Sequence, residues 1–380
     1  MHALHAERGA RFVPFAGYEM PVQYRLGVLK EHLHTRAAAG LFDVSHMGQL
    51  MLAGPGCAAQ MEALVPVDVV DLAVRQQRYA LFTHADGGIL DDLMITRLQA
   101  QPGQSEAAQD LLFVVVNAAC KEQDTAHLTK NLQGCTVTPL SEHALLALQG
   151  PAAAAVMARL APAVDFGSWT FMTACTIEFA AGPGAECLVT RSGYSGEDGF
   201  EISIPNAAAD ALARKLLDQP EVELVGLGAR DSLRLEAGLC LYGHDIDVHT
   251  TPVEAGLTWA ISKARRPGGV RAGGFPGSER ILGQIERGVE RKRVGLIGVE
   301  RTPVREGAEL VDAAGASIGR VTSGGFGPSC PAPMSGSIAM GYVAAPHAAL
   351  GSTIFALVRG RRVEMRVARM PFVPARYYRI

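Results

Sequence analysis

The sequence predicts an α+β protein with two related α/β modules, each an antiparallel sheet with helices, followed by an all-β barrel. Three observations predict this class: a repeated strand-helix unit, alternating apolar runs joined by turns, and short Val/Ile runs split by glycines from about Arg293 onward. A chain of 380 residues exceeds one ordinary hydrophobic core, so several domains are expected. We place them at residues 1–140, 141–285 and 286–380.

The repeated unit occupies residues 50–66 and 146–162. Each copy has the pattern of a short strand, a Gly-Pro pair and an Ala-rich helix. Chance similarity between Ala-rich helices is the alternative explanation. The matching Gly-Pro pairs and the matching positions of Met61 and Met157 favour duplication of one structural unit.

Three strand-like runs follow the first unit, at residues 78–84, 89–98 and 111–117. The first two are joined by Ala-Asp-Gly-Gly at 85–88, a strong hairpin signal, and the last two by a polar loop at 99–110. Runs connected in this way predict an antiparallel meander.

The middle run carries adjacent carboxylates, Asp91 and Asp92, among apolar residues. Successive strand side chains point to opposite faces, so at least one carboxylate must lie against a packed surface and needs hydrogen bonds, a cation or a ligand. Asp92 and Asn117 should lie near the same sheet edge. For Asp91 the favoured interpretation is a cap on a backbone donor of the turn at 86–88.

A second pair of strands, at residues 186–191 and 200–204, flanks the loop at 192–199. The apolar residues of the second strand alternate, which places Glu201 on the opposite face. A carboxylate held there can accept two parallel hydrogen bonds from a planar N–H and NH2 edge, as a guanidine or a pterin offers. The alternative is a solvated face, and this residue alone favours the alternative.

Residues 226–238 have the pattern of a glycine turn that opens a helix, with Arg230 and Arg234 on one face. Arg230 lies in the first turn, where free N–H groups and the helix dipole favour an anion such as a ligand carboxylate. Asp231 replaces the third glycine of a dinucleotide fingerprint, so a nucleotide site is not expected. The alternative is that both arginines pair with Asp231 and Glu236 in an ordinary surface ladder.

Composition restricts the classes of function. A net charge of -3 argues against a nucleic-acid partner, although residues 263–293 hold nine Lys or Arg side chains, which form a solvated surface or dock an acidic partner or an anionic tail. No apolar stretch reaches the length of about 18 residues that a membrane span needs. The seven cysteines form no C-x-x-C pair and the histidines no H-E-x-x-H motif, so we expect a cytoplasmic protein without a metal site.

Six unusual strings are spread over the chain: FVPFAGYEMPVQY at 12–24, GLFDVSHMG at 40–48, GILDD at 88–92, RSGYSGEDGFE at 191–201, ARDSLRLEAGLCLYG at 229–243 and MPFVP at 370–374. Together they resemble the aminomethyltransferase, or T-protein, of the glycine cleavage system, essentially from end to end. Members usually carry several residues before the first His-rich helix, so the resemblance also predicts a start upstream of Met1.

The resemblance implies a three-domain cloverleaf with a ligand channel in its centre that holds tetrahydrofolate as co-substrate. The partner would be the lipoylated H-protein, whose dihydrolipoyl arm carries an aminomethyl group. The products would be methylenetetrahydrofolate, ammonia and the reduced arm. No metal, flavin or NAD is implied.

The resemblance also assigns roles to single residues. Asp92, the second Asp of GILDD, matches the key acidic residue near the reacting folate nitrogens and would be catalytic. The residues that would bind the folate are Glu201 for the pterin, Asn117, Arg230, Tyr377 and, within the 191–201 string, Tyr194.

Two related classes compete with this interpretation. A non-catalytic folate-binding protein of the same fold would carry a Cys-containing signature between its central and last domains, and residues 254–280 contain no cysteine. The folate-dependent half of a sarcosine or dimethylglycine dehydrogenase would need a flavin-binding fingerprint, which this chain lacks.

Overall fold

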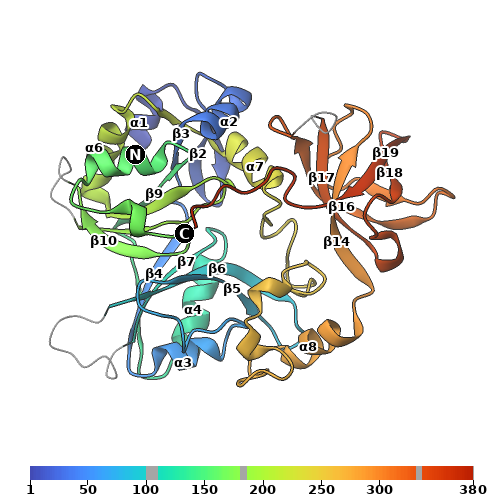
Figure 1. Cartoon of the computed structure of the whole chain (residues 1–380), viewed down its shortest axis with the longest axis horizontal. Helices are drawn as coiled ribbons and strands as arrows, with labels where there is room; N and C mark the ends of the chain where they lie inside the picture. The colour runs from blue at the N-terminus through green and yellow to red at the C-terminus, as the bar shows by residue number, and fades with distance from the viewer. Residues whose placement is uncertain (100–109, 180–185, 331–335, 380) are drawn as a thin grey trace. The chain divides into compact units, whose positions relative to one another are not determined.

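The computed structural model describes residues 1–99, 110–179, 186–330 and 336–379 (Figure 1). The chain forms two compact units, which are Met1–Leu81 with Asp91–Arg230 and Arg376–Ile380, and Phe82–Leu90 with Asp231–Ala375. Each unit is described by itself, and the division into three domains as a cloverleaf stays a prediction.

The first sheet has five strands in the order β5-β6-β7-β4-β8. Their bounds are β4 Gly48–Gly54, β5 Gln77–Thr83, β6 Ile89–Leu98, β7 Asp110–Val116 and β8 Thr136–Pro139. Because β5, β6 and β7 are consecutive neighbours, the predicted meander is confirmed. The helices α3 (Cys57–Glu62) and α4 (Lys121–Asn131) contact this sheet, as Figure 1 shows. The polar loop predicted at 99–110 lies outside the described residues, except for its two end residues.

The second sheet has six strands in the order β10-β11-β12-β9-β3-β13. Their bounds are β3 Ala39–Asp43, β9 His143–Gln149, β10 Ala174–Glu178, β11 Glu186–Thr190, β12 Gly199–Pro205 and β13 Val222–Leu224. All pairs are antiparallel except β13 with β3, which is parallel. The helices α5 (Ala153–Leu160) and α6 (Asn206–Leu217) pack on it, and the core contains Phe200 and Ile202, as the alternation in β12 predicts.

The repeated unit is visible in both sheets, as β4 with α3 and as β9 with α5. In each copy a glycine ends the strand in a backbone conformation that other residues rarely adopt, with φ of 148° at Gly54 and 135° at Gly150. An added Cβ would lie 2.8 Å from the carbonyl oxygen of Gly134 in the first copy and 2.3 Å from that of Ala38 in the second. The Gly-Pro pairs therefore mark the same tight exit from a buried strand.

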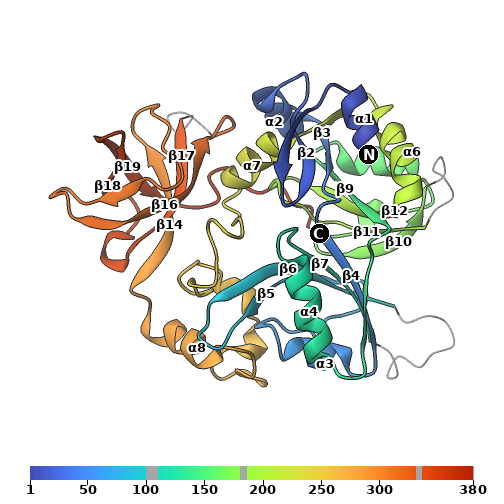
Figure 2. The same cartoon turned by 180° about the vertical axis from the view of Figure 1, so that it is seen from behind.

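The described part of the first unit also contains the 3-10 helix η1 Phe166–Ser168, a two-stranded sheet and three further α-helices. The sheet and the α-helices are β1 Arg11–Phe15, β2 Tyr18–Gln23, α1 His2–Glu7, α2 Val28–Ala37 and the start of α7 Leu227–Glu236. β2 and α2 contact each other and lie side by side in Figure 2. The boundary between the units falls inside α7, after Arg230.

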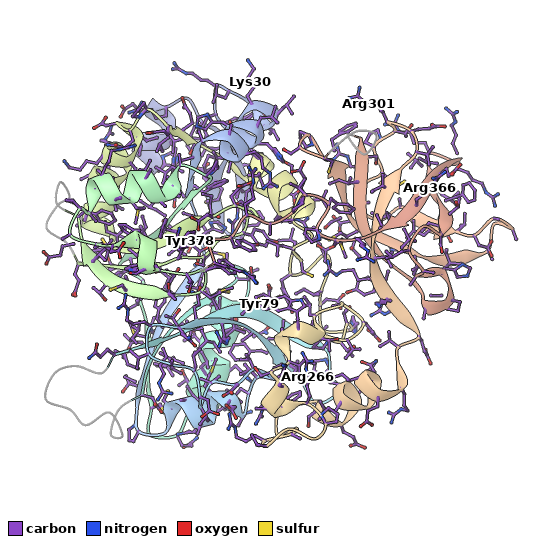
Figure 3. All side chains as sticks on the ribbon, in the orientation of Figure 1. Lys30, Tyr79, Arg266, Arg301, Arg366 and Tyr378 are labelled. Carbon is purple, nitrogen blue, oxygen red and sulfur yellow. The ribbon has the colours of Figure 1, made fainter. Side chains whose placement is uncertain are left out.

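The second unit contains a closed barrel in the order β14-β17-β16-β15-β18-β19, together with α8 Ser278–Arg287. The strands are β14 Arg291–Gly298, β15 Glu309–Val311, β16 Ser317–Phe326, β17 Ser337–Ala344, β18 Thr353–Val358 and β19 Arg361–Ala368. In β19, Val363 and Met365 are buried, whereas Arg366, labelled in Figure 3, is exposed. Closure removes unpaired strand edges, and the predicted α+β class with a C-terminal all-β barrel is confirmed.

Candidate functional site

Asp92 of β6 meets Asn117, the residue that follows β7. Asn117 Nδ2 donates to Asp92 Oδ1 at 2.7 Å and to the Asp92 carbonyl oxygen at 3.1 Å. The hairpin turn and the antiparallel register bring the start of β6 and the end of β7 to the same sheet edge. The predicted convergence of these residues is therefore confirmed.

Asp91, on the other face of β6, is 0% exposed and also contacts Asn117. The backbone N–H of Asn117 donates to Asp91 Oδ2 at 3.0 Å, and its Nδ2 donates to Asp91 Oδ1 at 2.8 Å. The interpretation of Asp91 as a cap on the turn at 86–88 is therefore wrong. Its backbone donor lies at the end of β7, which becomes adjacent only when the sheet forms.

The environment of Asp92 makes its carboxyl group unusually basic. Burial, together with the negative charge of Asp91 and against the hydrogen bonds from Tyr79 and Asn117, raises the pKa of Asp92 to about 7. The Tyr79 hydroxyl, on the neighbouring strand β5 and labelled in Figure 3, donates to Asp92 Oδ2 at 3.0 Å. Asp92 can thus gain or lose a proton near neutral pH, as proton-transfer chemistry requires.

The loop at 192–199 carries Tyr194 and leads into β12, and Gln149 at the end of β9 holds it from beneath. Gln149 Nε2 donates to the Ser192 carbonyl at 2.9 Å, and the Ser195 hydroxyl donates to Gln149 Oε1 at 2.8 Å. A Cβ added at Gly193 would lie 1.8 Å from Gln149 Oε1. The glycine is therefore needed for this close approach.

Arg191 fixes the other side of the loop and is 2% exposed. Its guanidinium donates to both carboxylate oxygens of Asp198, at 2.9 and 2.6 Å, and to the carbonyls of Phe166 and Trp169, each at 2.6 Å. We expect Arg191→Ala to lower the free energy of unfolding by about 3 to 5 kcal/mol, because a half-buried carboxylate and two carbonyls lose their donors. Urea denaturation measures this value.

The matched control is Arg159→Ala in helix α5, which packs on the same sheet. Arg159 pairs with Glu221 at a partly exposed site. Loss of this exposed ion pair should lower the free energy of unfolding by less than about 1 kcal/mol. Equal costs for the two variants would contradict the proposed anchoring of the loop by Arg191.

Glu201 lies on the face of β12 opposite the apolar core, as predicted. The Ser192 hydroxyl donates to Glu201 Oε2 at 3.1 Å and also bonds the Thr190 hydroxyl at 2.7 Å. Burial raises the pKa of Glu201, and the charge of Arg230 and the Ser192 hydrogen bond partly offset this. The alternative of an ordinary solvated face is therefore wrong, because this carboxylate is half-buried and held by a neighbour.

Arg230, in the first turn of α7, places its guanidinium carbon 4.7 Å from the ring centroid of Tyr194. Burial lowers the pKa of Arg230, while Tyr194 and Glu201 raise it, so it remains a cation at neutral pH. Within the described residues its guanidinium donates no hydrogen bond. The predicted surface ladder is wrong for Arg230, whereas Arg234 does pair with Asp231, at 2.7 Å.

His46 lies within range of the charge of Arg230. Burial and the positive charges of Arg230 and Lys121, opposed by Asp43, together lower the pKa of His46 to about 4. Lys121 is the first residue of α4 and follows the turn that starts at Asn117. A neutral imidazole therefore lies within range of the charges of Arg230 and Lys121, in the unit that also holds Asp92 and Glu201.

Tyr377 lies in the C-terminal segment that returns to the first unit. Its ring stacks on Phe171 at a centroid distance of 4.0 Å, and burial raises its pKa, with Glu197 adding to this and Arg36 opposing it. In the part of the chain that the structure describes, its ring contact is with Phe171 and not with Glu201 or Arg230.

Three residues of this region, Tyr79, Ser192 and His46, are not among the predictions made from the sequence. Tyr79 and Ser192 lie inside a predicted strand and a predicted loop, so strand alternation and loop position are signals that point to them. The sequence gives no signal that brings His46 beside Arg230, because 184 positions separate them (230 − 46).

Other expectations concern metals, thiols and membranes. Among residues 1–99, 110–179, 186–330 and 336–379, no group of three or more His, Cys, Asp or Glu side chains could hold a metal ion. The seven cysteines are free thiols. None of the described helices is both long enough and apolar enough to span a bilayer.

Two family models match the chain. The model described as "GCVT N-terminal domain" covers residues 1–265, and the "Glycine cleavage T-protein C-terminal barrel domain" covers residues 291–374. The second match coincides with the closed barrel. The family predicted from the sequence motifs is therefore confirmed.

Individual relatives match over the whole chain. The mitochondrial aminomethyltransferases of Homo sapiens and Dictyostelium discoideum are 44% and 41% identical, and the alignments cover 100% of this chain and 90% and 93% of the relatives. The crystal structure of glycine cleavage system aminomethyltransferase T from Bartonella henselae is 44% identical, with a TM-score of 0.89 over 100% of this chain and 98% of that one. These matches favour the transferase over the non-catalytic alternative. The chain belongs to the glycine cleavage T-protein family, the aminomethyltransferases.

Proposed function

We propose that this aminomethyltransferase takes the one-carbon unit of an aminomethyl group on the dihydrolipoyl arm of H-protein and transfers it to tetrahydrofolate. Ammonia, 5,10-methylenetetrahydrofolate and the reduced arm are the products. The observation that carries the proposal is the Asp92 carboxyl group, which Asn117 and Tyr79 hold in place and whose pKa lies near neutral.

Glu201 and Arg230 supply the binding groups. The Ser192 hydroxyl uses one lone pair of Glu201 Oε2, so Oε1 and the second lone pair of Oε2 can accept from a planar N–H and NH2 edge such as that of a pterin. Arg230 offers a cation with unused N–H donors beside the ring of Tyr194. Because the charges of Arg230 and Glu201 act on each other, Arg230 lies near the proposed pterin site, where its N–H donors can bond acceptor atoms of the folate.

Asn117, Tyr194 and Tyr377 have supporting roles in this proposal. The described residues give Asn117 Oδ1 no donor, because Nδ2 faces the carboxylates, so the oxygen can accept a hydrogen bond from the folate. Tyr194 extends the aromatic surface against Arg230. Tyr377, stacked on Phe171, would line the site through the segment that ends the chain.

Asp92 has the properties that the chemistry needs. Departure of the thiolate from an aminomethyl thioether leaves an iminium-like carbon, which a fixed carboxylate can stabilise while it orients the attacking folate amine. Ring closure then expels ammonia, and a group whose pKa is about 7 can accept and return the protons. No nucleophile of the protein needs to form a covalent bond.

The direct test mixes the purified protein with tetrahydrofolate and aminomethylated, lipoylated H-protein and follows ammonia release. We expect folate-dependent release of ammonia together with methylenetetrahydrofolate. Ammonia release should be lost when the folate is omitted or when the H-protein carries no lipoyl group. Folate binding without ammonia release would instead support a non-catalytic folate-binding protein.

The compartment remains part of the proposal. Free cysteines fit a reducing compartment, and we propose the cytoplasm. Several relatives are named as mitochondrial proteins. Fractionation of the source cells with antibody detection tests the assignment.

A further inference from the structure

We propose that Asp124 is a positioning residue of the active site: its carboxylic acid donates a hydrogen bond to Asp91, which fixes the Asn117 amide that holds Asp92. The inference rests on the proposed function, because it concerns how the proposed catalytic group is held. Asp124 lies on α4 and is 1% exposed, so it acts through other residues.

The first step concerns the charge of Asp91. Both of its carboxylate oxygens accept hydrogen bonds from Asn117, one from the backbone N–H and one from Nδ2. The Cys120 thiol donates a further hydrogen bond. A protonated Asp91 would have to turn one oxygen into a donor and lose an acceptor contact. Burial raises the pKa of Asp91 as well, but the hydrogen bonds from Asn117 oppose that rise, so within this pair Asp91 is the better placed to carry the negative charge.

The second step locates the proton. Asp124 shares a side-chain hydrogen bond with Asp91, and two buried carboxylates in contact do not both ionise at neutral pH. Asp124 Oδ2 accepts no hydrogen bond from an N–H or hydroxyl group of the described residues. Burial, the hydrogen bond with Asp91 and the charges of Asp91 and Asp92 together raise the pKa of Asp124 to about 9. Asp124 is thus the acid that donates to Asp91.

The third step connects this pair to Asp92. Because Nδ2 of Asn117 faces Asp91 Oδ1 and Asp92 Oδ1, the amide has one favourable orientation, with Nδ2 toward the carboxylates. Asp91 also contributes its negative charge, the second cause after burial of the raised pKa of Asp92. Asp124 therefore supports both the position and the basicity of Asp92.

Three other titratable groups surround the pair of Asp91 and Asp124. Asp92 faces it from β6, Tyr79 reaches Asp92 from β5, and Cys120 precedes α4. Burial, followed by the charges of Asp91 and Asp124, raises the pKa of the Cys120 thiol, which stays neutral. Loss of the Asp124 proton is then the change on the alkaline side. It places two repelling anions behind Asn117 and loosens the hold on Asp92.

The test compares Asp124→Asn with Asp124→Leu by the pH dependence of turnover. The asparagine amide still donates to Asp91 but cannot ionise, so this variant should keep neutral-pH turnover and lose the fall in kcat centred near pH 9 that we expect of the wild type. The leucine variant has no donor and should lose roughly 10-fold to 100-fold in kcat with little change in the KM for tetrahydrofolate. The control is Glu122→Gln, an exposed acid on the same helix.

A second readout needs neither folate nor activity. Infrared titration of the unliganded wild type should show a protonated carboxyl band that disappears with a midpoint near pH 9 and that Asp124→Asn lacks. An unchanged alkaline fall in Asp124→Asn, full kcat in Asp124→Leu, or absence of the band would each overturn the inference. If the variants do not fold, the infrared band of the wild type still tests the inference. A fully active Asp92→Asn enzyme with the band present would refute the proposed function alone.

Discussion

Asp92→Asn is expected to bind tetrahydrofolate nearly as well as the wild type and to lose roughly 100-fold to 1,000-fold in turnover. The amide keeps the shape of the side chain, and its oxygen can still accept from Asn117 while Tyr79 turns its hydroxyl to accept. It cannot carry the negative charge or exchange the proton. Ammonia release under saturating substrates measures kcat, and a folate titration measures the affinity.

The pH profile provides a sharper form of this prediction. Since burial raises the pKa of Asp92 to about 7, the anion is the minor form below that pH and the major form above it. The wild-type rate should therefore rise as the pH increases through 7, and Asp92→Asn should lack this rise. By linkage, the native state binds this proton more tightly than the unfolded chain, so Asp92 makes the fold less stable as the pH rises from about 4 to about 7.

The control is Asp86→Asn at the tip of the same hairpin, where the carboxylate is 88% exposed. This variant should match the wild type in rate and in pH profile. Unchanged turnover in Asp92→Asn would remove Asp92 from the mechanism. Loss of folate affinity equal to the loss in rate would make it a binding residue.

Alternation of apolar residues and turn signals are enough to predict the strands that carry the site residues. The alternation in 89–98, the Gly-Gly turn before it and the apolar run after it determine which ends of β6 and β7 meet, and this places Asp92 beside Asn117. The same alternation places Glu201 away from the core. These predictions hold because each depends on neighbours in sequence or on one hairpin.

Contacts between residues that are far apart in the sequence could not be predicted in this way. The Asp91 contact with the Asn117 backbone depends on where β7 leaves the sheet, and the Arg230 contact with Tyr194 depends on how α7 packs on the loop. Asp124 lies on α4, whose sequence is mostly polar, so nothing in its spacing indicates a buried acid. Tyr377 was identified from family resemblance alone, and its stacking on Phe171 became visible only with the returning C-terminal segment.

Glu201→Gln should have the opposite kinetic signature to Asp92→Asn. The amide loses the charge and one of the two acceptor oxygens that a pterin edge needs, while it can still accept from Ser192. Loss of a charge-assisted hydrogen bond costs about 1.5 to 3 kcal/mol, which corresponds to a roughly 10-fold to 150-fold weaker affinity for tetrahydrofolate. With folate at saturation, kcat should stay near the wild-type value, because the reacting carbon is proposed to face Asp92.

The pH dependence of binding separates this role from a structural one. Burial raises the pKa of Glu201, so the wild type should lose folate affinity on acidification at a higher pH than an ordinary glutamate would cause, and Glu201→Gln should lack that loss. Glu223→Gln, an exposed glutamate on β13 of the same sheet, is the matched control and should behave as the wild type. A Glu201→Gln enzyme with unchanged KM for tetrahydrofolate would show that another group grips the pterin, since the remaining acceptor cannot replace a two-point contact with a charged carboxylate.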